Sequence, residues 1–184
     1  MRKIVLTYGL IAGSVMAAMF LVTLPFHDQI GFERGMVVGY ATMVAAFLLV
    51  FFGVRTYRDD VAGGTVSFGR ALGVGMLIVL VASVVYTVTW QIVFFGFMPD
   101  YLVKYQEYAL GKAQAAGATA AQLAAQRAEM ARFAEQYRNP LFNAAVTMME
   151  PLPVGLVMAL ASAGILRRRA GGRTEGEEAL ARAV

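Results

Sequence analysis

Four long apolar stretches take up about half of this chain and constrain its fold more than any other feature. They run from about Ile4 to Pro25, Gly35 to Val54, Ala71 to Phe97 and Pro140 to Leu166. A helix needs about 20 mostly apolar residues to cross a bilayer, and each stretch is long enough to do so. The sequence therefore predicts an all-α integral membrane protein with four transmembrane helices in a bundle.

Composition agrees with this prediction and argues against several classes of function. Of the 184 residues, 59% are hydrophobic and 15% are charged. Cysteine is absent and His27 is the one histidine, so we expect no metal site and no cofactor. The net charge is +4, but the basic residues gather at the ends of the apolar stretches, where topology explains them better than nucleic acid does. Candidate nucleophiles such as Ser83 and Ser162 lack a nearby histidine, and we do not expect an enzyme.

The positions of Lys and Arg predict the orientation in the membrane. Arg167, Arg168 and Arg169 follow the last stretch directly, and Arg2 and Lys3 precede the first. Basic residues at membrane ends stay on the cytoplasmic side, which places both termini in the cytoplasm. The first stretch is longer than the apolar region of a signal peptide and is interpreted as an uncleaved helix. Residues 1–169 then form the transmembrane domain, and the polar residues 170–184 are predicted to be a disordered cytoplasmic tail.

The segment 99–139 is too polar to span a membrane but has helical patterns. Tyr101, Tyr105 and Tyr108 recur at helical spacing, Gly117 interrupts, and Thr119 with Gln122 forms a capping-box pattern. We therefore predict an extracytoplasmic helical hairpin between the third and fourth transmembrane helices. Its apolar stripes pack on each other or on lipid headgroups in one interpretation. In the other they dock a partner, either a membrane protein or a second copy of the chain.

Small residues recur at four-residue spacing in every apolar stretch. Lipid gives helices no hydrophobic reason to associate, so close approach through small residues is the expected means of packing. These faces are used within the chain or, alternatively, form a homodimer contact. They comprise Gly9, Gly13 and Ala17; Gly35 and Gly39; Gly69 and Gly73; and Gly155, Ala159 and Ala163.

Glu150 is the one acid inside an apolar stretch, where a charge is costly. Counted back from Leu166 at 1.5 Å per residue, it lies about 24 Å from the inner interface, in the outer leaflet. The same count brings Tyr40, Tyr86 and Gln91 to a similar depth. We predict that Glu150 is buried against protein, with a hydroxyl or amide of one of these three within hydrogen-bond reach.

A short outer loop from Phe26 to Arg34 is predicted between the first two helices. Arg34 in this loop lies just above Glu150 and completes a candidate intramembrane polar cluster with Glu150, Tyr40, Tyr86 and Gln91. Pro151 and Pro153 predict a helix kink beside this cluster, because each removes a backbone donor and frees a carbonyl. A broken helix next to a carboxylate either builds an ion or solute site or merely bends the helix. Both interpretations remain open from the sequence.

Several short motifs together resemble a known family. They are Tyr57-Arg58-Asp59, Gly63-Gly64, Ser67-Phe68-Gly69 with Ala71, then Glu150, Val154-Gly155-Leu156 and Ile165-Leu166-Arg167-Arg168. The chain resembles, over about residues 2–169, the bacterial membrane family called domain of unknown function 4199. The resemblance implies a four-helix inner-membrane protein and supplies no mechanism.

The function predicted from these features is that of a structural or partner-binding membrane component. The alternative is a small transporter or ion-conducting oligomer that uses Glu150 as its titrating or coordinating group. A water-filled path to Glu150 would favour the alternative. A dry bundle with an exposed apolar hairpin would favour the first.

Overall fold

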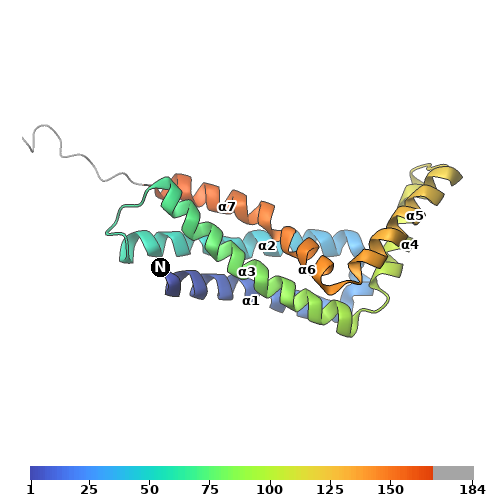
Figure 1. The fold of residues 1–184 in the computed structure, drawn as a ribbon, viewed down its shortest axis with the longest axis horizontal. Coiled ribbons are helices and arrows are strands. Elements are labelled where there is room, and N and C mark those ends of the chain that lie inside the picture. Colours follow the sequence, from blue (N-terminus) through green and yellow to red (C-terminus); the bar gives the residue numbers. More distant parts are fainter. Residues whose placement is uncertain (168–184) are drawn as a thin grey trace, which may run out of the picture.

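A computed structural model describes residues 1–167, which form a bundle of helices (Figure 1). The predicted tail at 170–184 lies outside the described residues, as do Arg168 and Arg169. The elements are α1 (Arg2–Thr23), the 3-10 turn η1 (Leu24–Phe26), α2 (His27–Asp60), α3 (Phe68–Phe97), α4 (Tyr101–Ala115), α5 (Ala120–Tyr137), α6 (Pro140–Met149) and α7 (Pro151–Leu166).

The long helices lie side by side along the long axis of the molecule (Figure 1). α3 and α2 both pack on α1 and on α7, and α6 packs on α3. α4 and α5 pack on each other and lie at one end of the bundle, which we call the α4–α5 end. The N-terminus and the last turn of α7 lie together at the opposite end (Figure 1). The all-helical fold predicted from the sequence is confirmed for the described residues.

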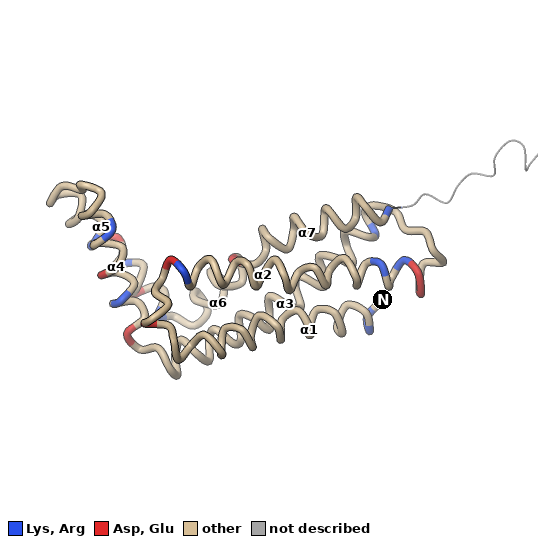
Figure 2. Tube along the Cα trace, turned by 180° about the vertical axis from the view of Figure 1, so that it is seen from behind, with Lys and Arg blue, Asp and Glu red and all other residues tan. Residues whose placement is uncertain are grey.

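The outer surface of the bundle is largely apolar between its two ends, as expected for helices in contact with lipid. Among the described residues, three helical runs are long and apolar enough to cross a membrane, Arg2–Asp60, Phe68–Phe97 and Pro140–Leu166. Figure 2 shows the charged residues gathered toward the two ends, with few between them. Large apolar side chains such as Leu48, Ile92 and Val157 are exposed along the outside of the bundle. An apolar surface of this extent is typical of a membrane-embedded protein.

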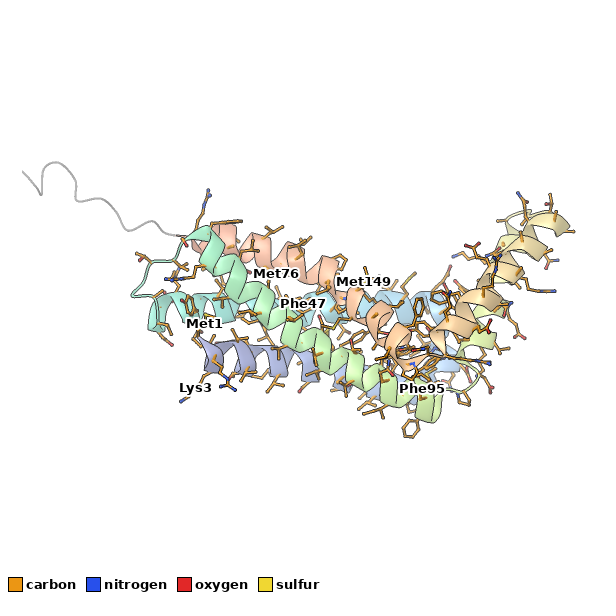
Figure 3. The ribbon with its side chains drawn as sticks, in the orientation of Figure 1. Met1, Lys3, Phe47, Met76, Phe95 and Met149 are labelled. Atoms are coloured by element: carbon orange, nitrogen blue, oxygen red, sulfur yellow. The ribbon has the colours of Figure 1, made fainter. Side chains whose placement is uncertain are left out.

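The interior is packed through small residues where helices approach most closely. A Cβ on Gly13 of α1 would lie 2.6 Å from the Cβ of Val85 on α3, and one on Gly155 of α7 would collide with a methyl of Val79. Phe47, which is fully buried, lies in the middle of the bundle (Figure 3). Close packing through glycine is therefore confirmed for α1 and α7. On α2 and α3 the predicted small-residue contacts are not made, because a Cβ added to any of the four glycines would have no atom within 4 Å. These are Gly35, Gly39, Gly69 and Gly73.

The connection between α1 and α2 is more helical than the sequence indicated. We expected a loop from Phe26 to Arg34, but the chain passes from η1 directly into α2. Gly31 interrupts α2 with φ 72° and ψ 166°, a conformation that favours glycine. The chain thus turns at η1 and Gly31 while most of its backbone hydrogen bonds remain helical.

The local signals in the segment 99–139 correspond to the helix ends that the structure shows. Thr119 caps α5 through its side chain, and the Gln122 side chain accepts from the Thr119 backbone, which completes the capping box. Gly117 adopts φ 87° between α4 and α5. α4 begins at Tyr101, and Asp100 occupies its N-cap position.

Candidate functional site

A cavity of about 830 Å³ lies at the α4–α5 end of the bundle. It is lined from α1, α2, α3 and α4, with contributions from α5 and α6, and it extends from Lys112 to Glu150. The buried residues of α2 begin only at Met43, so residues 31–42 stand apart from the core. Gly35 and Gly39 line this part of the cavity, and a Cβ added to either would have no atom within 4 Å. The cavity thus lies where residues 31–42 of α2 stand apart from the core.

Glu150 and Tyr86 meet at this cavity. The Tyr86 hydroxyl on α3 donates to Glu150 Oε2 at 3.0 Å, which confirms the predicted hydrogen bond from one of Tyr40, Tyr86 and Gln91. We expected Glu150 to be buried, and that expectation was wrong: its side chain is exposed and lines the cavity. The physical reason is that residues 31–42 of α2 do not close over it.

The other members of the predicted cluster are divided between three places. Tyr40 lines the same cavity from α2. Gln91 instead donates to Asn143 Oδ1 at 2.9 Å and to the Pro140 carbonyl at 3.0 Å. Five residues along a helix turn through about 140°, which explains why Gln91 and Tyr86 serve different neighbours.

Arg34 lines an adjoining hollow of about 320 Å³ beside Tyr108 and Glu33 and is not part of the cavity lining itself. The structure therefore joins Glu150 to Tyr86, places Tyr40 on the lining of the same cavity, and leaves Gln91 and Arg34 outside that lining.

The backbone is interrupted where Glu150 projects. α6 ends at Met149 and α7 begins at Pro151, with Glu150 between them in a helical conformation. Pro151 has no N–H to offer the Thr147 carbonyl, and the Glu150 N–H donates to that carbonyl at 3.2 Å instead. The predicted helix interruption at Pro151 thus lies directly at the carboxylate, whereas Pro153 lies inside α7.

A chain of buried polar side chains supports one wall of the cavity, and the sequence analysis did not identify it. Trp90 Nε1 on α3 donates to the Tyr137 hydroxyl at 2.9 Å, and that hydroxyl lies 3.3 Å from Thr147 Oγ1. Thr147 Oγ1 donates in turn to Asn143 Oδ1 at 3.4 Å. Asn143 and Thr147 are polar residues four apart in an apolar stretch, and this spacing was the available signal. Burial raises the pKa of the Tyr137 hydroxyl, which keeps it protonated for this role.

Aromatic rings form a continuous wall from α1 across α3 to α4. The ring centroid of Trp90 lies 5.3 Å from Phe20 and 5.1 Å from Tyr101. Tyr101 lies 5.7 Å from Phe32, which lies 5.4 Å from Tyr105. All five rings line the cavity. Burial raises the pKa of the Tyr101 hydroxyl, so the ring stays uncharged.

Two ion pairs fasten α4 to the start of α2 at the outer side of the cavity. Lys104 Nζ lies 2.8 Å from Asp28 Oδ1, and Lys112 pairs with Glu33. Hydrogen bonds from these lysines hold the pKa values of both carboxyl groups below their ordinary values. α4 is thus tied across the cavity by charge as well as by aromatic contacts.

The described residues contain no group of three or more His, Cys, Asp or Glu side chains placed to hold a metal ion. The site instead combines one carboxylate with rings and apolar side chains, which is the composition of a binding cavity.

Comparison with known proteins places the chain in a family without supplying a function. No curated protein and no solved structure matched it. One family model matched residues 7–168, most of the chain. The protein therefore belongs to the family described as Protein of unknown function (DUF4199).

Proposed function

We propose that this protein is a four-pass bacterial inner-membrane protein that admits a small solute to the cavity from its α4–α5 end. The run Arg2–Asp60 contains α1 and α2, which lie side by side and would therefore cross the membrane twice. Basic residues at the opposite end favour a cytoplasmic position for that end. They include Lys3, Arg55, Arg58, Arg70 and Arg167.

The observation that carries the proposal is the cavity that reaches Glu150. A carboxylate in an apolar region is costly unless it is paired or hydrated, and the cavity gives it access to water. The sequence favoured a structural or partner-binding component, with a solute pathway as the alternative. The path to Glu150 is the feature that distinguishes the two, and it supports binding or transport of a solute over a purely structural role.

The α4–α5 pair fits this role as an extracytoplasmic hairpin that covers the cavity. Its tyrosines face α2 and the cavity, because Tyr101, Tyr105 and Tyr108 all line that space. The hairpin is therefore assigned to shaping the solute site, and a second copy of the chain is not required for it.

Cysteine labelling tests this function directly, because the native chain has no cysteine and each variant carries one thiol. In intact spheroplasts, a membrane-impermeant maleimide should label Gly39→Cys, since Gly39 lines the cavity. Val37 and Ala41 bracket Gly39 in depth, and both are exposed outside the cavity lining. The matched variants Val37→Cys and Ala41→Cys should react slowly, because a thiol against lipid meets little water and forms little thiolate.

Equal labelling at positions 37, 39 and 41 would contradict a discrete water path. Labelling of position 39 only after the inner face is opened would contradict entry from the α4–α5 end. In either case the proposed function fails, whatever the chemistry of the solute.

A further inference from the structure

We propose that the cavity takes a lipophilic monocation, a molecule with an apolar body and one delocalised positive charge held at Glu150. This inference rests on the proposed function and names the chemical class of its solute. Three independent features of the cavity lead to it: its charge, its ring-lined wall and its unfilled volume.

The charge of the lining favours a cation at the inner end. Lys112 and His27 are the positively chargeable groups that line the cavity. Lys112 pairs with Glu33, and His27 Nδ1 lies 3.8 Å from Asp28 Oδ1, so each already has an acidic neighbour. Within residues 1–167, no basic side chain forms an ion pair with Glu150, whose hydrogen-bond partner is the neutral Tyr86 hydroxyl. The carboxylate is thus left available for a charge that the solute brings.

The rings near Glu150 suit a cation with a spread-out charge. Tyr86 and Trp90 are four residues apart on α3 and therefore share one face of that helix, with Trp90 on the side toward α4. Trp90 contacts Phe20 edge to face, and Tyr40 lines the cavity from α2. Aromatic faces attract cations within about 6 Å of the ring centroid, most strongly when water is excluded. A small hydrated ion would gain little from this wall, whereas an apolar cation would gain from both the rings and the carboxylate.

The size of the cavity matches an organic molecule. Its volume of about 830 Å³ lies within the range of about 300 to 1,000 Å³ that is usual for small-molecule sites. Gly35 and Gly39 leave the α2 wall flat, since neither has an atom within 4 Å of a Cβ position. The space is therefore much larger than one metal ion or proton carrier needs.

Equilibrium dialysis of the purified full chain in detergent tests this class with two probes of the same shape and opposite charge. Tetraphenylphosphonium should bind the native protein saturably, and tetraphenylborate should bind at least tenfold more weakly. This comparison uses the native chain and is independent of any variant's folding.

Glu150→Gln should weaken tetraphenylphosphonium binding at least tenfold, while the amide oxygen can still accept the hydrogen bond from Tyr86. Glu135→Gln removes an exposed acid on α5 outside the lining and should bind as the native chain does. Unchanged thermal unfolding of both variants would establish that folding is not the cause.

Equal binding of both probes, stronger binding of tetraphenylborate, or no binding of either would overturn the monocation. So would full binding by Glu150→Gln. Each of these results is compatible with selective labelling of Gly39→Cys, so a wrong solute class can be told apart from a wrong proposed function.

Discussion

Replacement of Gly13 by alanine should destabilise the bundle, because α1 and α3 are in contact at this glycine. An added Cβ would lie 2.6 Å from Val85 Cβ, 3.0 Å from Val85 Cγ1 and 3.1 Å from the Ala82 carbonyl oxygen. Rotation of the valine side chain cannot move its Cβ, so relief requires a shift of one helix backbone. The perturbation therefore acts on the separation of α1 and α3 and not on a flexible side chain.

The magnitude follows from two opposing contributions. Overpacking a tight interior costs about 1 to 3 kcal/mol. Alanine has a higher helix propensity than glycine by about 1 kcal/mol, which offsets part of this cost. Because the clash includes a Cβ and a backbone oxygen, the upper part of the range applies, and we expect a net loss of about 2 kcal/mol in the free energy of unfolding. Gly9→Ala on the same face should behave alike, since its Cβ would lie 2.6 Å from Val81 Cβ.

Thermal unfolding in detergent, followed by the fluorescence of the single Trp90, measures this effect. For a chain of this length, 2 kcal/mol corresponds to a fall in Tm of about 4 to 8 °C. Gly73→Ala is the matched control, because its Cβ would have no atom within 4 Å. This control should keep or slightly raise Tm. The double variant Gly9→Ala/Gly13→Ala should lose less than the sum of the single losses, because one shift of α1 relieves both clashes.

A Gly13→Ala protein as stable as the native chain would refute the close α1–α3 contact on which the bundle depends. An equal loss for Gly73→Ala would show that glycine is needed for some reason other than the space available.

Three further outcomes are expected. Tyr137→Phe should lower the free energy of unfolding by about 1 to 3 kcal/mol, since it leaves the buried Trp90 N–H without its acceptor; chemical or thermal unfolding measures this loss, and unchanged stability would count against the buried chain. Lys104 lowers the pKa of Asp28, so their pairing supports α4 above the ordinary carboxyl value of 3.8 and weakens as pH falls below it. The protection of α4 amides against hydrogen exchange, taken relative to their intrinsic exchange rates at each pH, should accordingly fall at acid pH in the native chain and change less in Lys104→Gln. Ala116 lies at the C-terminal end of α4, at the turn of the hairpin, and Ala116→Cys should react with an impermeant maleimide in intact spheroplasts. Reaction only after the inner face is opened would contradict an extracytoplasmic hairpin.

The helices themselves could be predicted from the sequence because their signals are local. Each of these signals depends only on residues that are close together in the sequence. The long apolar stretches are helical in the structure, the Thr119–Gln122 capping box begins α5, and Gly117 separates α4 from α5. The prediction of a loop from Phe26 to Arg34 was wrong, because a polar segment can still be helical and this one forms the start of α2. A single glycine at φ 72° allows the chain to turn there without a loop.

The candidate site could be predicted only in part. Equal depth in a bilayer follows from counting residues, and it correctly paired Tyr86 with Glu150, while Tyr40 lines the same cavity. Depth does not specify the direction in which a side chain points, and Gln91 turns toward α6 for that reason. The buried link from Trp90 to Tyr137 joins residues 47 positions apart, a separation that no local pattern reports.

The sequence by itself determined that this protein is helical, that its long helices are apolar enough for a membrane, and that Glu150 is the costly residue within them. Only the tertiary structure decided which glycines are contacts and which border empty space. Gly13 and Gly39 have the same small side chain and similar spacing, yet one lies against Val85 and the other lines the cavity. The difference arises because packing depends on how helices diverge along their length, and that divergence is a property of the whole bundle.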